Sequence, residues 1–192
     1  MCGAAAKICL VVPHTHWDRE WYLPFETFRI GLVRAIDRLM ALLESDPSYT
    51  HFMLDGQSIV LEDYLALRPG QEERLRAHVR SGRVAVGPWY VLPDVFLVSG
   101  ESLIRNLEIG LAIATRMGGS MRVGYLPDSF GHIAQTAQLL AGFGMDTASL
   151  WRGVSEENAG CEWSWEALDG SRVYVQWLSG GYGNLANLPA DP

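Results

Sequence analysis

Three residues of the kinds that commonly bind metal ions lie within five positions in the segment PHTHWDREW, residues 13–21. His14, His16 and Asp18 are spaced two apart, and in an extended chain such side chains point to the same face. Two imidazoles and a carboxylate are ordinary ligands for a divalent ion such as Zn²⁺. The alternative is a set of hydrogen-bonded polar side chains at the end of a strand. Three ligand-type residues in so short a segment favour the metal site.

Two further motifs place an aspartate directly after a proline. In GYLPDSFGH, residues 124–132, the turn can aim the Asp128 carboxylate into a cleft. Asp128 is equally suited to cap the following helix or to form an Asx-turn. In GPWYVLPDVF, residues 87–96, Asp94 follows an aromatic segment, and an aspartate in a solvated loop explains it equally well. Spacing alone leaves both alternatives open.

Tryptophan is abundant, with 7 residues in a chain of 192, and several lie in or beside these motifs. Sugar rings stack their C–H faces on indole rings, so tryptophans beside carboxylates favour a carbohydrate site. The alternative is that most of these large side chains fill the core.

Short apolar segments alternate with amphipathic segments along the chain, and these elements must position the motifs. Strands are expected at residues 7–13, 51–54, 83–91, 122–126 and 147–151. The first should be buried on both faces, and the third should bend at its Gly-Pro pair. Helices are expected at residues 25–44, 58–67, 71–81, 101–117 and 134–142. A β-hairpin with a type I′ turn at Asp169–Gly170 should join strands at 161–167 and 172–178.

This alternation predicts an α/β fold with a mainly parallel sheet, either open or closed into a barrel. Ligands bind at the carboxyl ends of the strands in such folds. Titratable residues follow each predicted strand, beginning with the histidine motif and continuing with Asp55, Asp94, Asp128, His132 and Arg152. We therefore predict a functional site at these strand ends.

Composition narrows the class of protein. A chain with 48% hydrophobic and 19% charged residues is not intrinsically disordered. With 15 Lys and Arg against 22 Asp and Glu, the net charge of −7 argues against a nucleic-acid partner. We expect no membrane-spanning segment, no signal peptide and no disulfide framework, and hence a cytoplasmic protein.

Seven motifs in one order resemble the N-terminal catalytic region of glycoside hydrolase family 38 α-mannosidases. They are HTHWDREW, FMLDGQSIVLEDY, GPWYVLPD, SGESLIRNL, GYLPDSFGH, LWRGV and WLSGGYGN, and the resemblance runs from about residue 8 to residue 187. It implies a distorted (β/α)7-type barrel with mainly parallel strands, incomplete in this chain. Residues 1–192 would be the N-terminal part of the catalytic domain, without the later helical and β domains of the family.

The resemblance also implies a metal site and a nucleophile. His16, Asp18 and Asp128 match family ligands of one Zn²⁺ or another divalent ion, and Asp128 also matches the catalytic nucleophile. The family's general acid and its fourth metal ligand, a histidine, are expected beyond residue 192.

Three more residues match the substrate site of the family. Trp21 matches the floor under the mannose ring, Arg152 a contact to the substrate or nucleophile, and Asp94 an aspartate of the sugar site. Relatives often have Asp-Glu-Phe where this chain has Asp94-Val95-Phe96, which weakens the case for a second carboxylate in this loop.

The implied activity is retaining hydrolysis of terminal α-mannosides or mannose-containing oligosaccharides, through a covalent mannosyl-aspartate intermediate. Two alternatives stay open. One is a zinc-dependent carbohydrate deacetylase, although the motifs of that class differ from PDSFGH. The other is a non-catalytic remnant that binds metal or sugar, since the 192-residue chain lacks an identified acid and is expected to depend on further sequence for activity.

Overall fold

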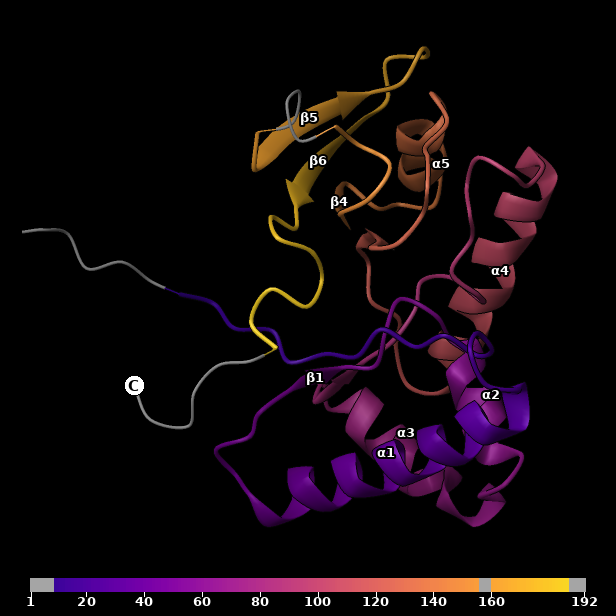
Figure 1. Ribbon diagram of the computed structural model, residues 1–192, viewed down its shortest axis with the longest axis vertical. Coiled ribbons are helices and arrows are strands. Elements are labelled where there is room, and N and C mark those ends of the chain that lie inside the picture. The colour runs from indigo at the N-terminus through magenta and orange to yellow at the C-terminus, as the bar shows by residue number, and fades with distance from the viewer. Residues whose placement is uncertain (1–8, 156–159, 187–192) are drawn as a thin grey trace, which may run out of the picture.

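The computed structural model of the protein describes residues 9–155 and 160–186 (Figure 1). Its helices are α1 (Phe25–Ser45), α2 (Ile59–Leu65), α3 (Glu72–Arg80), α4 (Gly100–Arg116) and α5 (Thr136–Gly142), with a 3₁₀ turn, η1 (Pro69–Gln71), before α3. Its strands are β1 (Phe52–Met53), β2 (Val84–Ala85), β3 (Gly124–Leu126), β4 (Thr147–Leu150), β5 (Glu162–Glu166) and β6 (Arg172–Trp177). The helix predictions are confirmed to within a few residues at each end.

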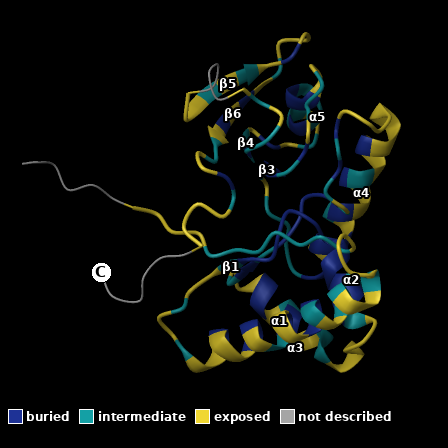
Figure 2. Ribbon diagram, viewed as in Figure 1, coloured by how far each residue is buried: buried dark blue, intermediate teal, exposed yellow. Residues whose placement is uncertain are grey.

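Periodicity explains the longest helix. The apolar residues of α1 at Leu32, Ile36, Leu39 and Leu43 fall on one face and are buried. The opposite face is exposed (Figure 2). None of the described helices has an apolar stretch sufficient to span a bilayer.

The strands form two sheets. β1 pairs with β2 in parallel, and β3, β4 and β6 form a second parallel set. β5 is added at the edge of β6 in the antiparallel direction. The α/β fold with mainly parallel strands is therefore confirmed, whereas the described residues form no closed sheet.

Two hydrophobic clusters divide the molecule into two lobes. The helical lobe, residues 25–86, packs α1, α2 and α3 around the β1–β2 sheet. The sheet lobe, residues 122–178, packs α5 against the four-stranded sheet. Helix α4 runs along both lobes (Figure 1) and contributes buried side chains to both clusters. Trp89 is fully buried and donates its indole N–H to the Tyr125 carbonyl at 3.1 Å, which ties the chain between the lobes to β3.

The prediction of a buried first strand is wrong for residues 9–13; residues 7 and 8 lie outside the described part. Leu10 is 85% exposed, and the segment pairs with β1 only at a bridge between His14 and Met53. Two hydrogen bonds make this bridge, Met53 N–H to the Pro13 carbonyl at 2.9 Å and Thr15 N–H to the Met53 carbonyl at 3.2 Å. No described strand lies on the other side of the segment, so its apolar residues stay in solvent.

Two glycines change the expected strand geometry. Gly87 has a φ of 82°, which turns the chain out of β2 and confirms the predicted bend. The hairpin between β5 and β6 is confirmed, but its type I′ turn is wrong. Gly170 N–H donates to the Ala167 carbonyl at 3.0 Å, and Gly170, not Asp169, has positive φ. This is the longer hairpin loop that ends in a left-handed glycine.

Candidate active site

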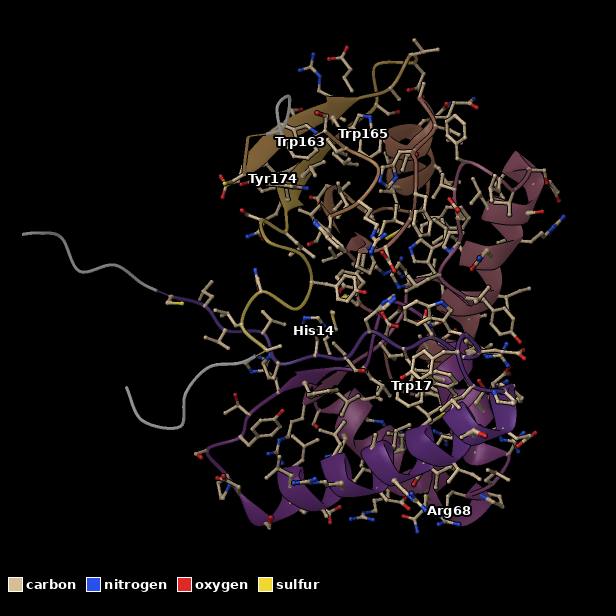
Figure 3. The ribbon with its side chains drawn as sticks, in the orientation of Figure 1. His14, Trp17, Arg68, Trp163, Trp165 and Tyr174 are labelled. Carbon is tan, nitrogen blue, oxygen red and sulfur yellow. The ribbon has the colours of Figure 1, made fainter. Side chains whose placement is uncertain are left out.

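The histidine motif lies between the two lobes. Figure 3 shows His14 and Trp17 in the middle of the molecule, with the helical lobe on one side and the sheet lobe on the other. The bridge to Met53 holds the motif at the carboxyl end of β1. Asp128 and Arg152 follow β3 and β4, so their side chains start from the carboxyl ends of those strands. The sequence predicted this convergence.

Four of the predicted site residues are in contact. The Nε2 atom of His16 lies 3.7 Å from Oδ1 of Asp18 and 3.6 Å from Oδ2 of Asp128. Oδ1 of Asp128 forms an ion pair with Nε of Arg152 at 2.5 Å. Helix α5 begins only at Thr136 and has no side-chain cap, so Asp128 is not its N-cap. The cleft alternative is thereby favoured for this aspartate.

The donor set of His16, Asp18 and Asp128 suits a divalent ion. Two ligand atoms about 2.1 Å from one tetrahedral ion lie roughly 3.4 Å apart, which is close to both distances from His16. Both ring nitrogens of His16 are buried and have no hydrogen-bond partner in the described part of the chain. Within that part, however, no group of three His, Cys, Asp or Glu side chains has the geometry of a preformed site.

Asp55 and Gln57 hold the same segment in place. Asp55 was predicted only as one of the titratable residues at the strand ends, and Gln57 was not predicted. Oδ2 of Asp55 accepts the Trp17 N–H at 2.8 Å, and the Gln57 amide donates to the Trp17 carbonyl at 2.7 Å. Burial raises the pKa of Asp55, although His16 and these hydrogen bonds lower it. The position of Asp55 directly after a strand was the available signal.

Tyr182 also borders the site, and the sequence did not predict this contact. Gly180 and Gly181 both have positive φ, and the loop they form carries Tyr182 against His16, with ring centroids 4.5 Å apart. His14 donates through Nε2 to the Tyr182 carbonyl at 2.7 Å, so His14 orients this loop and not the carboxylates. Burial, with the charges of nearby carboxylates, raises the pKa of Tyr182.

Arg152 stands beside an aromatic hollow. Its guanidinium carbon lies 4.6 Å from the Trp151 ring centroid and 5.0 Å from that of Phe130. The hollow has a volume of about 440 Å³, and its lining comprises Trp151, Arg152, Gly153, Val154 and Trp177. Arg152, which lines the hollow, also forms the ion pair with Asp128, so the hollow lies next to this carboxylate.

Asp94 lies in a loop that is joined to the Asp128 loop, because the Ser129 hydroxyl donates to the Pro93 carbonyl at 2.7 Å. Oδ1 of Asp94 is buried and has no hydrogen-bond partner among the described residues. His132 donates to the Arg152 carbonyl at 3.0 Å, and burial lowers its pKa. Both residues therefore border the cleft without contacting His16.

Most of the tryptophans pack in or against the core, whereas Trp21 is exposed. Trp89 is fully buried, and most of the others pack against the two clusters, as the core alternative predicted. Trp163 and Trp165 lie on the hairpin, remote from His14 (Figure 3). Trp21 is 74% exposed and contacts the ring of Tyr22 edge-on, so the structure does not bring it to the carboxylates.

The comparisons with known proteins agree with this architecture. The N-terminal domain of the glycosyl hydrolases of family 38 matches residues 7–188. The chain belongs to glycoside hydrolase family 38. A putative mannosylglycerate hydrolase of Halalkalibacterium halodurans is 40% identical over 96% of this chain and 22% of its own length. Human alpha-mannosidase 2C1 is 31% identical over 87% of this chain and 16% of its own length.

A solved family 38 structure supports the fold. The crystal structure of an alpha-mannosidase from Enterococcus faecalis V583 has a TM-score of 0.87 and 38% identity, covering 90% of this chain and 20% of that protein. The chain thus spans about a fifth of the length of these family 38 relatives.

Proposed function

We propose that this chain is the N-terminal part of the catalytic domain of a retaining α-mannosidase, with Asp128 as the nucleophile. The observation that carries the proposal is the contact of His16, Asp18, Asp128 and Arg152 at the strand ends of a family 38 chain. A distorted (β/α)7-type barrel, completed by further sequence, would enclose the strand ends that carry these four residues.

The proposed reaction has two displacements. In the first, a carboxylate oxygen of Asp128 bonds to the anomeric carbon of mannose, and the bond from that carbon to the leaving oxygen breaks as a general acid protonates this oxygen. In the second, the same group, now deprotonated, takes a proton from water as the water oxygen bonds to the anomeric carbon and the ester bond to Asp128 breaks. Arg152 orients the Asp128 carboxylate through their ion pair. The acid is expected from sequence beyond residue 192, and within the chain Asp94 is the first candidate.

His16, Asp18 and Asp128 would hold one Zn²⁺ or another divalent ion. When bound, this ion would supply a positive charge that attracts hydroxyl oxygens of the sugar. The aromatic hollow beside Arg152 is within the size range of small-ligand sites, and its two indoles suit stacking by a sugar ring. Trp21 is exposed, and its segment would have to move toward the carboxylates for the indole to contact the mannose.

Hydrolysis of an aryl α-mannoside by the protein in its longest natural form tests the proposal. Asp128→Asn should reduce kcat by about 10³-fold or more, because the amide cannot form the glycosyl ester. The matched control is Asp169→Asn in the hairpin turn, where the carboxylate accepts hydrogen bonds from Ser171. Chelation should also abolish activity, and NMR should show α-mannose as the first product.

A fluorinated mannosyl inhibitor that traps the intermediate separates the alternatives. Label on Asp128 supports the retaining mechanism. Release of acetate from an acetylated sugar, without label, would establish the deacetylase instead. Binding of metal or sugar by the longest natural form without turnover would establish the non-catalytic remnant.

Mannosylglycerate is a second candidate substrate within the same chemistry, because the putative mannosylglycerate hydrolase of Halalkalibacterium halodurans is 40% identical to this chain. Comparison of kcat/KM for mannosylglycerate and an aryl α-mannoside decides between them. A higher value for the aryl mannoside would remove mannosylglycerate as the preferred substrate.

A further inference from the structure

We propose that Asp55 is a positioning residue that fixes His16 and the peptide unit between His16 and Asp18 for metal binding. The inference rests on the proposed metal site and assigns to it a residue that does not itself contact the ion. The supporting observations are the burial of Asp55, its hydrogen bonds and its backbone conformation.

Asp55 is completely buried, and both oxygens of its carboxylate accept hydrogen bonds. Oδ2 accepts the Trp17 N–H at 2.8 Å and the Gln57 amide at 2.9 Å, while Oδ1 accepts the Gly56 N–H at 2.7 Å. Because Gln57 also donates to the Trp17 carbonyl at 2.7 Å, Asp55 and Gln57 together bind the backbone N–H and carbonyl of Trp17. Trp17 stands between His16 and Asp18, so this pair fixes the backbone from which both side chains project.

Asp55 also faces the ring of His16. Oδ2 of Asp55 lies 3.9 Å from Nδ1 of His16, while Nε2 of the same ring faces Asp18 and Asp128. Histidines that bind metal through one nitrogen usually present the other to a carboxylate or carbonyl, which fixes the ring and its tautomer. At 3.9 Å the pair is an electrostatic contact and not a hydrogen bond.

The backbone at Asp55 has a conformation that few residues with a Cβ atom adopt. Asp55 has a φ of 60°, and no other non-glycine residue in the described ranges has positive φ. This conformation is costly for residues with a Cβ atom, and glycine adopts it most easily. Retention of an aspartate here places a negative charge under the ligand segment.

Titration with Co²⁺, followed by absorption spectroscopy, tests the proposal on wild type, Asp55→Asn and Asp55→Gly. The asparagine keeps the side-chain size, and the glycine accepts the backbone conformation without strain. Both should bind Co²⁺ about 10- to 100-fold more weakly than wild type, with shifted ligand-field bands, because the His16 ring is no longer held. The matched control is Asp37→Asn, which removes a carboxylate bound to Tyr64 in the helical lobe. It should leave both Kd and the spectrum unchanged.

Unfolding temperatures without metal are measured for every variant, so that a loss of folding is separated from a loss of affinity. Wild-type Kd and spectrum in either folded Asp55 variant would overturn the proposal. An equal loss of affinity in Asp37→Asn would overturn it as well, because the effect would then be one of general stability. Absence of Co²⁺ binding by wild type would instead refute the metal site itself, and the inference with it.

Discussion

The carboxylates of the helical lobe and those of the cleft differ in how they are paired. In the helical lobe, Glu44 accepts two hydrogen bonds from Arg74 at 2.6 Å, and Asp63 accepts two from Arg19 at 2.6 and 2.9 Å. At the strand-end site, buried atoms of His16 and Asp94 have no hydrogen-bond partner among the described residues, and one oxygen of Asp128 pairs with Arg152. Folded proteins rarely leave buried polar atoms unpaired, so the cleft has the character of a binding site.

The contrast separates two kinds of polar residue. The Glu44–Arg74 and Asp63–Arg19 pairs join segments that are distant in the chain and stabilise the fold. The polar residues of the cleft are left available for a ligand, and their removal should change chemistry more than stability. The strand-end residues keep their positions only if the two lobes stay fixed relative to each other. This depends on the segments that join the lobes, such as α4.

Gly110→Ala should have the largest effect on stability, because it tests how α4 joins the lobes. A Cβ atom at Gly110 would lie 2.2 Å from the Trp89 carbonyl carbon and 2.3 Å from the Pro88 oxygen, and backbone cannot easily give way. We expect a loss of about 3 kcal/mol in the free energy of unfolding, measured with urea. Gly100→Ala, in the same helix with nothing near the new atom, should change it by less than about 1 kcal/mol. Equal effects would show that the close approach is absent.

Asp63→Asn tests the paired side of the comparison. The change removes the carboxylate that binds the Arg19 guanidinium at two points and leaves an amide in a largely buried position. We expect a loss of about 1–3 kcal/mol in the urea unfolding free energy. Wild-type stability in this variant would mean that the pair contributes no more than an exposed one.

Asp128→Asn tests the strand-end site. Its ion pair with Arg152 is partly exposed, with the two side chains 24% and 41% accessible, and such pairs contribute little. The unfolding free energy should change by less than about 1 kcal/mol, although the activity proposed above should be lost. A loss of stability comparable to that of Asp63→Asn would show that Asp128 serves the fold, and would remove the contrast.

Sequence patterns predicted the helices and the convergence of residues at the strand ends, and the family resemblance implied that His16 and Asp128 lie together. Apolar spacing defines the buried face of α1, and the residues after parallel strands meet at one edge. The hydrogen bond from the Trp17 N–H to Asp55 was not predicted. It depends on the bridge between His14 and Met53, which brings the two segments together.

Two errors have the same physical cause. The apolar run before His14 has a strand composition, but pairing depends on neighbours that composition does not reveal, and the described residues place only β1 beside it. In the hairpin, Asp169–Gly170 suits a two-residue turn, whereas the register of β5 against β6 leaves a longer loop. Local sequence preference correctly predicted the hairpin. Tertiary pairing decided how many residues of each segment form a ladder.

The smallest expected effect is the pH dependence that comes from Glu44. Hydrogen bonds from Arg74 and then His78 lower the pKa of Glu44 to about 2. A depressed pKa in the folded state means that this stabilisation is present above the unfolded pKa, near 4.3, and is lost as the pH falls toward 2. Because 45% of the Glu44 side chain is accessible, the contribution should stay below about 1 kcal/mol.

Urea unfolding of wild type and Glu44→Gln between pH 5 and pH 2 measures this contribution. The variant should be less stable than wild type at pH 5 and nearly equal to it at pH 2, because the glutamine has no charge to lose. Other carboxylates titrate in both proteins, so only the difference between the two curves reports on Glu44. A constant difference across this range would mean that Glu44 is held by packing and not by charge, and that the pairing which distinguishes the helical lobe from the cleft is weaker than the distances indicate.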